Sequence, residues 1–579
     1  MPGYPVKFKG IFDSYYYVNN TYYLANIKYF SFKLKAKVCI DLLINQLYTK
    51  PIFMKKPVII SGALLLLSSA LWYGCQKAAT FTDNTTGTAA TVATPSLTNK
   101  ITSGTSLVIE GLNGDITTNE SSAFLTYMNG VSAPATNDQN TWVFGNPAYQ
   151  TEACGLMYDA TKNQSILDRM IYLCDAALAG RNDLASAANG GQRVLWTGNI
   201  EPVWPSSAPT DSPQTAGVEQ GQIISHMAFC AKLILQNSSI WNTSVTGGDP
   251  HGYGATYKAR ALTYIAQADY VIDNWITPHF VRTSDKKLYF PPAPNPYKPG
   301  DPAPWNQMFM VTNAMIRLIQ CHLVLADAAS RITQYDGVVQ ANVNWFTSNL
   351  TANTAPDGAA CWNWKYALGG STEDTNHFAY DAEGLWNAYD SGRYGVTLTQ
   401  IKNMANTYYD IVLATVTGGI YAGKVDGTTG TGNSGGDDYV RWQYYYLGDI
   451  RKDRYFYESN IDIANSKYVS SAQITAGILW LKHRRYAAGI GDVYLYQNCS
   501  YGGWKAAFDV GNFLEADLIA KGGVNDDASS IHVPPGMQVI LYTNNSYGGT
   551  ALTLTADDAC LSDHSFNDAT SSLKVSQLP

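Results

Sequence analysis

Two copies of one pattern occupy the C-terminal end of the chain. The first copy reads VYLYQNCSYGGWKAAFDVG over 493–511 and VNDDASSIHV over 524–533. The second copy reads VILYTNNSYGGTALTLTAD over 539–557 and FNDATSSLKV over 566–575. Each copy begins with residues that alternate as in a half-buried strand, passes a Tyr-Gly-Gly turn, and ends in a polar loop before a short strand. The repeat predicts two similar β motifs that form one domain over 492–579.

The order of these features in both halves resembles the βγ-crystallin domain, in which two Greek-key motifs pack as a small all-β sandwich. The family's calcium signature is two Asn or Asp residues, two variable residues, then Ser or Thr followed by Ser. It is present as NDDASS over 525–530 and as NDATSS over 567–572. The resemblance therefore implies a calcium-binding domain with two Ca²⁺ sites.

The resemblance also implies which residues hold the calcium. Six positions are expected to supply oxygens, through the carbonyls of Asp527 and Ala569, the hydroxyls of Ser529 and Ser571, and groups near Gln497 and Thr543 in the opposite motif. Ca²⁺ is a hard cation that takes several oxygens from loops of this kind. The alternative is that the Asn, Asp and Ser residues only cap turns.

Cys499 and Cys560 lie one in each half of the repeat. In an exported protein a disulfide between them is expected, and it would stabilise a small core.

A targeting signal is predicted over 54–75. A short basic segment, Met54-Lys55-Lys56, precedes the apolar run PVIISGALLLLSSAL over 57–71. That run is shorter than the roughly 20 residues of a membrane-spanning helix. Gly74-Cys75 follows it, and this arrangement resembles a bacterial lipoprotein signal with lipidation at Cys75. Trp72 and Tyr73 depart from the usual pattern, and an uncleaved anchor or an ordinary signal peptide are the alternatives.

The segments around this signal are expected to lie outside the folded domains. Residues 1–53 stand upstream of a signal that should be N-terminal, so we interpret them as a mis-assigned extension with Met54 as the true start. Residues 76–104 are rich in Thr, Ala and Asn and are expected to form a flexible linker. This organisation predicts a lipid-anchored protein of the bacterial cell envelope, periplasmic or on the outer surface.

Composition narrows the functional classes. The chain has 579 residues, of which 46% are hydrophobic and 15% charged, which excludes a chain disordered throughout. Lys and Arg total 39 against 46 Asp and Glu, so the net charge is −7 and nucleic acid is not expected as a partner. The chain contains 40 Tyr and 14 Trp, which suits an extracellular protein that handles sugars.

Residues 105–487 are predicted to be mainly α. Apolar residues recur at helical spacing in seven segments, at 165–179, 220–235, 257–276, 305–329, 377–389, 399–413 and 470–485. Long loops rich in aromatic residues, Gly and Pro separate them. Paired helices with long loops resemble the (α/α) toroid of many polysaccharide lyases and glycoside hydrolases. This is a likeness of architecture, and the function must be argued from a site.

The candidate catalytic residues lie mostly in 371–381. If a helix began at Ser371, then Glu373, His377 and Asp381 would share one face, with Asp374 beside them. A carboxylate beside an imidazole can fix its tautomer, as a general acid or base requires. The alternative is a helix cap, because Ser371 and Asp374 have the spacing of a capping box. Glu201, in another loop, completes the predicted catalytic set.

The predicted sugar-binding residues are aromatic rings, which stack on apolar sugar faces, and polar groups, which fix hydroxyls or a uronate. They are Arg193, Trp196, Trp204, Trp305, Asn306, Gln307, Trp362, Trp364 and Tyr366. For each Trp the alternative is a place in the core. His226 sits in an apolar helix and is expected to be a core residue. No cofactor is inferred for the helical region, and its scattered cysteines are expected to be buried small hydrophobes.

Two classes of function follow. The first is an envelope-anchored carbohydrate-active enzyme that acts on a polysaccharide, with the crystallin domain as an accessory. A glycoside hydrolase would need two carboxylates flanking the bond. A polysaccharide lyase would need a base such as His377 or Tyr366 and a cation such as Arg193. The second class is a non-catalytic polysaccharide-binding surface lipoprotein.

Overall fold

The computed structural model describes residues 106–578 apart from 135, 416–420, 430–440, 465, 467 and 489. The extension, the signal with Cys75 and the whole linker expected over 76–104 lie outside the described residues. The described chain is helical from its start to residue 487, apart from one hairpin of β1 (Thr351–Thr354) and β2 (Ala360–Asn363), and is β-rich beyond it.

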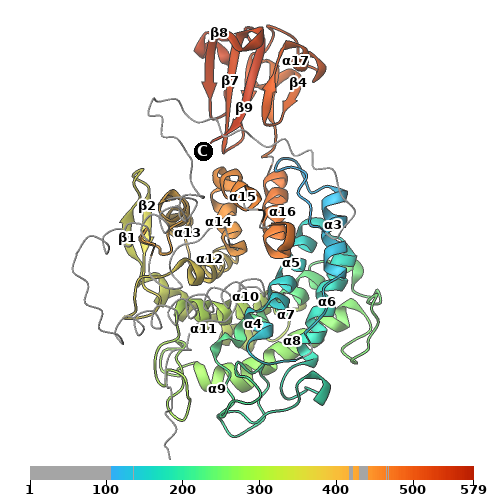
Figure 1. Cartoon of the computed structure of the whole chain (residues 1–579), viewed down its shortest axis with the longest axis vertical. Helices are drawn as coiled ribbons and strands as arrows, with labels where there is room; N and C mark the ends of the chain where they lie inside the picture. The colour runs from blue at the N-terminus through green and yellow to red at the C-terminus, as the bar shows by residue number, and fades with distance from the viewer. Residues whose placement is uncertain are drawn as a thin grey trace, which may run out of the picture. The chain divides into compact units, whose positions relative to one another are not determined.

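All seven predicted helical segments contain helices, although the one predicted over 305–329 ends at Leu325 (Figure 1). The longer helices are α3 (Thr118–Asn129), α5 (Asn146–Thr161), α6 (Gln164–Ala179), α7 (Gly221–Leu235), α8 (Tyr257–Val271), α10 (Trp305–Leu325), α11 (Ala329–Thr347), α12 (Thr375–Asp390), α13 (Leu398–Asn406), α15 (Tyr455–Ala464) and α16 (Ala472–Ala487). The shorter ones are α4 (Thr141–Phe144), α9 (Thr277–Phe280) and α14 (Tyr445–Ile450). Two helices are extended by π-helical turns, α8 through Ile272–Ile276 and α13 through Thr407–Val412.

Six of these helices make a closed series of contacts. Helix α5 packs on α7, α7 on α10, α10 on α12, α12 on α14, α14 on α16, and α16 on α5. A second set packs against members of the first, with α6 against α5, α8 against α7, α11 against α10 and α13 against α12. Helices of the first set therefore have neighbours on two or more sides.

This position explains the sequences of α7 and α10. A helix covered on all sides is apolar all round and has no polar stripe. In α7 every residue except Lys232 is buried. Helix α10 is long and apolar enough to cross a membrane, but 78% of its most apolar window is buried inside the protein, as in the core helix of a globular domain.

The C-terminal strands form two sheets. A three-stranded sheet has the order β4-β3-β6, and a four-stranded sheet has the order β5-β9-β7-β8. The strands are β3 (Val493–Asn498), β4 (Gly502–Phe508), β5 (Gly511–Phe513), β6 (Ser530–His532), β7 (Met537–Asn544), β8 (Gly548–Leu554) and β9 (Ser572–Gln577), with a short helix α17 (Glu515–Ala520) after β5. Strand β5 comes from the first sequence copy but pairs with β9 of the second, so the two motifs exchange a strand.

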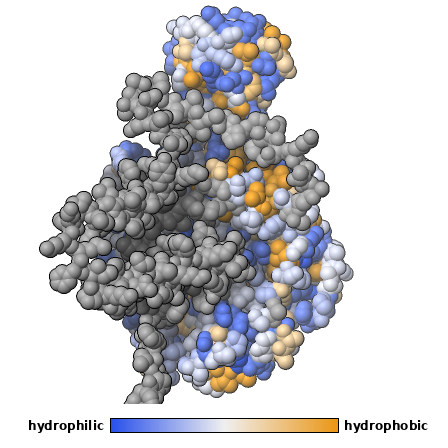
Figure 2. Space-filling view, viewed as in Figure 1, coloured by the Kyte–Doolittle hydropathy of each residue, from blue (hydrophilic) through white to orange (hydrophobic). Residues whose placement is uncertain are grey.

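The alternation read from the sequence sets the sandwich core. Val493 and Leu495 are buried, as are Val539 and Leu541 at the equivalent positions of the second copy. Both Tyr-Gly-Gly turns have the same backbone, with Ser500 and Ser546 each at φ 59°. In Figure 2 the surface of these strands, at the top of the view, mixes hydrophilic and hydrophobic residues. The predicted disulfide between Cys499 and Cys560 is present, and the five other cysteines of the described chain are buried free thiols.

Candidate functional sites

The polar loop of the second copy gathers oxygens from both copies. The Ser571 hydroxyl donates a hydrogen bond to Asp526 Oδ1 at 2.9 Å and lies 3.1 Å from the Thr543 carbonyl oxygen. Asp526 belongs to the first copy, whereas Ser571 and Thr543 belong to the second. One hydroxyl, one carboxylate and one carbonyl therefore meet at this point.

The loop of the first copy repeats the arrangement. The Ser529 hydroxyl donates to Asp568 Oδ1 at 3.0 Å. Asp526 and Asp568 both have left-handed backbones, with φ of 54° and 51°. Gln497 differs from its equivalent Thr543, because its amide Nε2 donates to Asp527 Oδ2 at 3.1 Å. A ligand from Gln497 would therefore come from its carbonyl groups.

The acidic side chains of these loops are not paired with basic side chains among the described residues. Within the described chain, no Lys, Arg or His side chain makes an ion pair with Asp526, Asp527 or Asp568, although other carboxylates of the sandwich such as Asp557 do make one. The donor set is made of hard oxygens, which suits Ca²⁺. The sequence analysis missed Asp526 and Asp568, since each serves the loop of the opposite copy. Their acidic side chains within the signature were the available signal.

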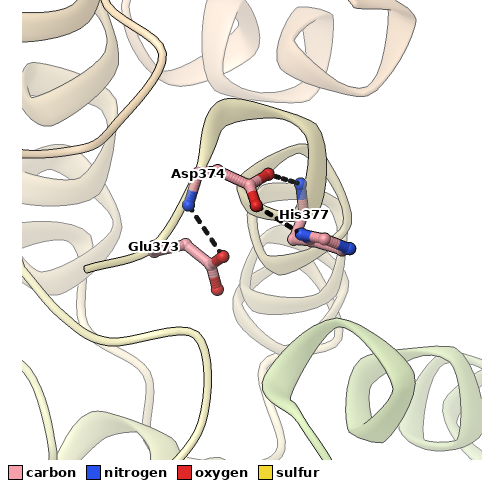
Figure 3. A group of neighbouring side chains, drawn as sticks. All are labelled: Glu373, Asp374 and His377. Atoms are coloured by element: carbon pink, nitrogen blue, oxygen red, sulfur yellow. Dashed lines mark hydrogen bonds and ion pairs between the residues drawn. The ribbon is translucent and has the colours of Figure 1, made fainter. Parts of the chain in front are cut away.

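The second candidate site lies at the start of α12. The helix begins at Thr375 with Asp374 as its N-cap, and not at Ser371, so the helical face predicted for Glu373 is wrong. Asp374 Oδ1 accepts the His377 backbone N–H at 3.0 Å, and Asp374 Oδ2 lies 2.7 Å from His377 Nδ1 (Figure 3). Asp374 therefore caps the helix in place of the Ser371–Asp374 capping box considered from the sequence, and it also orients the His377 imidazole.

Behind this pair lie two buried carboxyl groups. Glu373 and Asp381 are both fully buried. Glu373 accepts the Asp374 backbone N–H at 2.9 Å, and Asp381 accepts the Trp364 indole N–H at 3.0 Å. Burial raises the pKa of Asp381 to about 8. Burial and the neighbouring Asp381 hold the pKa of Glu373 well above its usual range. Burial therefore favours the neutral form of both carboxyl groups.

His377 is more accessible. About a third of its side chain (32%) is exposed, and its ring centroid lies 4.6 Å from that of Tyr366. Lys298, from the loop before α10, places its Nζ 5.5 Å from the Tyr366 ring centroid. Burial alone would raise the pKa of Asp374, but the hydrogen bonds from His377 lower it. The site therefore joins an oriented imidazole, a phenol and an ammonium group.

The same residues form a cluster of potential metal ligands. Glu373, Asp374 and His377 each offer one ligand atom, and these atoms lie within 4.8 Å of one another.

Several predicted sugar-binding residues are structural instead. Trp204, Trp305 and Trp364 are at most 2% exposed and bond through their indoles to Ala177, Lys365 and Asp381. They are core residues, and we do not propose that they contact a substrate.

Other predicted residues are held by loops. Arg193 bonds to Asn137 at 2.8 Å and to Gln214 at 3.0 Å. Trp362 is half-buried and donates to the Gln400 carbonyl at 3.0 Å. The first two contacts leave Arg193 little freedom to bind a substrate, and the third joins β2 to α13.

The remaining predicted residues do not join the His377 cluster. Trp196 packs on Trp275 and His279, and Glu201 accepts the Thr197 hydroxyl at 2.7 Å. No hydrogen bond or ion pair between described residues links Glu201 to that cluster, so it is not a second catalytic carboxylate there. The Asn306 and Gln307 side-chain oxygens are buried without a hydrogen-bond partner in the described chain.

Comparison with known proteins identifies one part of the chain. The development-specific protein S of Myxococcus xanthus is 31% identical over 88 residues, which are 15% of this chain and 50% of that protein. This chain thus spans about half the length of the curated relative it matches. No family model matches the chain.

Solved βγ-crystallin domains are similar too. The domain from Flavobacterium johnsoniae is 33% identical, and the match covers 15% of this chain and 93% of that one, with a TM-score of 0.14. The domain from Clostridium beijerinckii is 31% identical, and the match covers 14% and 95%, with a TM-score of 0.14. Residues 493–577 hold all the described strands except one hairpin, and we assign the match to them. The chain therefore contains a domain of the βγ-crystallin family.

Proposed function

We propose that the crystallin domain binds two calcium ions, one at each polar loop. The observation that carries this proposal is the Ser571 hydroxyl, which lies within 3.1 Å of both the Asp526 carboxylate and the Thr543 carbonyl. The Ala569 carbonyl would complete this site. The Asp568 carboxylate, the Ser529 hydroxyl and carbonyls of Asp527 and Gln497 would form the other. Water would fill the remaining positions, because Ca²⁺ takes six to eight oxygens.

Calcium titration of the full chain by calorimetry tests this proposal. The wild type should take up two ions, the Ser571→Ala variant one, and the Ser529→Ala, Ser571→Ala double variant none. Ser576→Ala removes an exposed hydroxyl on β9, far in register from both loops, and should leave the two ions bound. Absence of uptake by the wild type, or two ions on the double variant, would overturn the proposal.

We further infer that residues 105–487 form an (α/α) toroid. Its support is the closed series of contacts among α5, α7, α10, α12, α14 and α16, with outer helices packed against them. Successive inner helices are separated by outer helices, so they run in the same direction. The loops before α10 and α12 then lie at one end of the ring, where Tyr366, His377 and Lys298 are found.

As a second function, we propose that this end acts on an acidic polysaccharide as a lyase. Of the two reactions open to a carbohydrate-active enzyme, hydrolysis requires two carboxyl groups that flank the sugar bond. Glu373 and Asp381 are buried away from solvent, and Glu201 lies elsewhere. The accessible groups are an imidazole, a phenol and an ammonium, which are the groups that β-elimination from a uronate needs.

Each group then has a role. Asp374 holds the His377 proton on Nδ1, which leaves Nε2 to remove the proton next to the uronate carboxylate. Lys298 would take the place expected of Arg193 and neutralise that carboxylate. The Tyr366 hydroxyl would protonate the departing glycosidic oxygen as its bond breaks and a carbon–carbon double bond forms.

Absorbance near 235 nm during incubation with uronate polymers tests the reaction, because the unsaturated product absorbs there. His377→Ala and Tyr366→Phe should each lower the rate at least a hundredfold, whereas Arg193→Lys should have little effect. New reducing ends without a rise in absorbance would indicate a hydrolase. Binding without either product would indicate the non-catalytic polysaccharide-binding protein. A lipid anchor at Cys75 and a place in the bacterial envelope complete the proposal.

A further inference from the structure

A groove on the first crystallin motif has the features of a ligand site. It encloses about 290 Å³ and is lined by Tyr494, Tyr496, Tyr501, Lys505, His532 and Asp557. We call it the tyrosine groove. Its volume is near the lower end of the range for small-molecule sites, roughly 300–1,000 Å³.

Strand pairing explains why these side chains meet. Because Val493 and Leu495 of β3 point into the core, Tyr494 and Tyr496 point outward. Tyr494 lies opposite His532 on β6, and Tyr496 lies opposite Lys505 on β4. Three neighbouring strands thus present aromatic and basic groups on one solvent-facing surface.

The polar groups of the groove are oriented but not all neutralised. His532 Nδ1 lies 2.7 Å from Asp557 Oδ1, and the same carboxylate oxygen accepts the Val533 backbone N–H at 2.8 Å. Lys505 Nζ stands 3.6 Å from the Tyr494 ring centroid. In the described chain no carboxylate lies within ion-pair distance of Lys505. Lys505 therefore forms no ion pair in the described chain and lies over an aromatic ring, although Asp557 lines the same groove and Asp492 is near enough to interact with Lys505 electrostatically.

The second motif lacks this combination. The sequence copies align Tyr494 with Ile540, Lys505 with Ala551 and His532 with Lys574, while Tyr496 and Tyr501 match Tyr542 and Tyr547. The shared tyrosines belong to the motif as such, and three residues are particular to the first copy. The fold does not require these three, since the second copy forms the same strands without them.

We propose that the tyrosine groove binds an acidic saccharide. The tyrosine rings would stack on the apolar face of a sugar ring, Lys505 would pair with its carboxylate, and the fixed His532 would bond to its hydroxyls through Nε2. This site is separate from the calcium loops and from the His377 cluster, and the inference rests on neither. It would give the accessory domain a part in holding an acidic polymer.

Calorimetric titration of the full chain with trigalacturonate, and with neutral maltotriose as the comparison, tests this proposal. The chain should carry His377→Ala so that no turnover occurs, and calcium should be present throughout. Saturable binding of the acidic trimer is expected, and binding of the neutral trimer should be at least tenfold weaker.

The variants replace each particular residue by its counterpart in the second copy. Lys505→Ala should weaken binding of the acidic trimer about tenfold, the scale of one charge-assisted contact. Tyr494→Ile and His532→Lys together should weaken both trimers. Lys574→Ala, in the second motif, is the matched control and should change nothing. An unchanged melting temperature would show that each variant is folded.

Four results would overturn the proposal. The first three are no saturable binding by the parent chain, equal affinity for the acidic and neutral trimers, and a loss in Lys574→Ala as large as in Lys505→Ala. If the affinity survives in all groove variants, the saccharide binds in the helical region and the groove is not its site.

Discussion

The helical region and the crystallin domain differ in the partners that they give to their carboxylates. In the helical region Glu152 is fully buried, and Arg317 approaches its two oxygens at 2.6 and 3.0 Å while His226 Nδ1 lies at 2.7 Å. Tyr446 adds a hydrogen bond at 3.1 Å. Although burial opposes it, Arg317 and His226 lower the pKa of Glu152 to about 2. This charge is neutralised within the protein.

The crystallin domain leaves Asp526 and Asp568 to hydroxyl and amide donors. The bonds come from Ser571 and Ser529 and from the neighbouring Asn525 and Asn567. A large region can surround a charge with several helices, whereas a domain of two small sheets has few residues to do so. If the sandwich binds calcium as proposed, its stability should depend on the ion, whereas the stability of the helical region should not.

Removal of Arg317 should have the largest effect. Arg317→Leu leaves Glu152 buried without its cation, and breaking a buried pair typically costs about 3–5 kcal/mol. The free energy of unfolding of the helical region, measured by denaturant titration, should fall by that amount. Arg393→Leu is the matched control, because Arg393 pairs with Asp336 with 32% of its side chain exposed. It should cost less than about 1 kcal/mol. Equal losses in the two variants would contradict internal neutralisation.

Loss of the disulfide should affect only the sandwich. The bridge spans 61 residues between Cys499 and Cys560, and constraining such a loop is typically worth about 2–4 kcal/mol. Replacing both cysteines by Ser should lower the melting transition of the sandwich. The five other described cysteines are free, so a reductant should lower that transition in the wild type and leave the helical transition in place. A shift of the helical transition on reduction would be inconsistent with this assignment.

Calcium should change the thermal transition of the sandwich but not that of the helical region. A ligand present at a hundred times its dissociation constant stabilises the state it binds by about 2.7 kcal/mol. Scanning calorimetry should show the sandwich transition rise with calcium and fall with a chelator, while the helical transition does not move. Magnesium is the control ion, since it demands near-ideal octahedral geometry whereas Ca²⁺ accepts flexible sites. If both transitions rise together, the ion is not confined to the sandwich.

Much of this architecture follows from local patterns. Helical spacing located all seven predicted helices, because an amphipathic or fully apolar period is a property of the segment itself. The repeated copies predicted the sandwich, its turns and the bridge between Cys499 and Cys560. Core residues such as His226 also followed from their apolar neighbours.

The sites were less predictable, because their residues meet through tertiary structure. Asp526 serves the loop that contains Ser571, 45 residues away in sequence. Lys298 reaches Tyr366 from a separate loop. Trp204 and Trp364 are in motifs that would suit a sugar subsite, yet their indoles bond inside the core. Helix α12 begins four residues later than a start at Ser371 would give, because Asp374 is its N-cap and accepts the His377 backbone N–H.

The smallest expected effect is a pH dependence that the helical region should show. Burial raises the pKa of Glu383 to about 8, and nearby Glu152 adds to the effect. In the unfolded chain this carboxyl ionises near pH 4.5, so between these values the folded state holds a proton that the unfolded state has lost. Stability should therefore decline as pH rises from about 4.5 to 8 and level off above it.

Glu383→Gln tests this origin, since it keeps the shape and removes the titration. Thermal melting of the helical region at pH 5.5 and pH 8 should differ by a few degrees more in the wild type than in the variant. The sandwich transition in the same scans is the internal reference. If the melting temperatures of the wild type and the variant change in parallel with pH, the pH dependence of stability comes from another group. A steeper fall for the helical transition than for the sandwich would support the assignment of the slope to a buried carboxyl group of the helical region, where Arg317 lies 3.6 Å from Glu383 but makes its hydrogen bonds to Glu152.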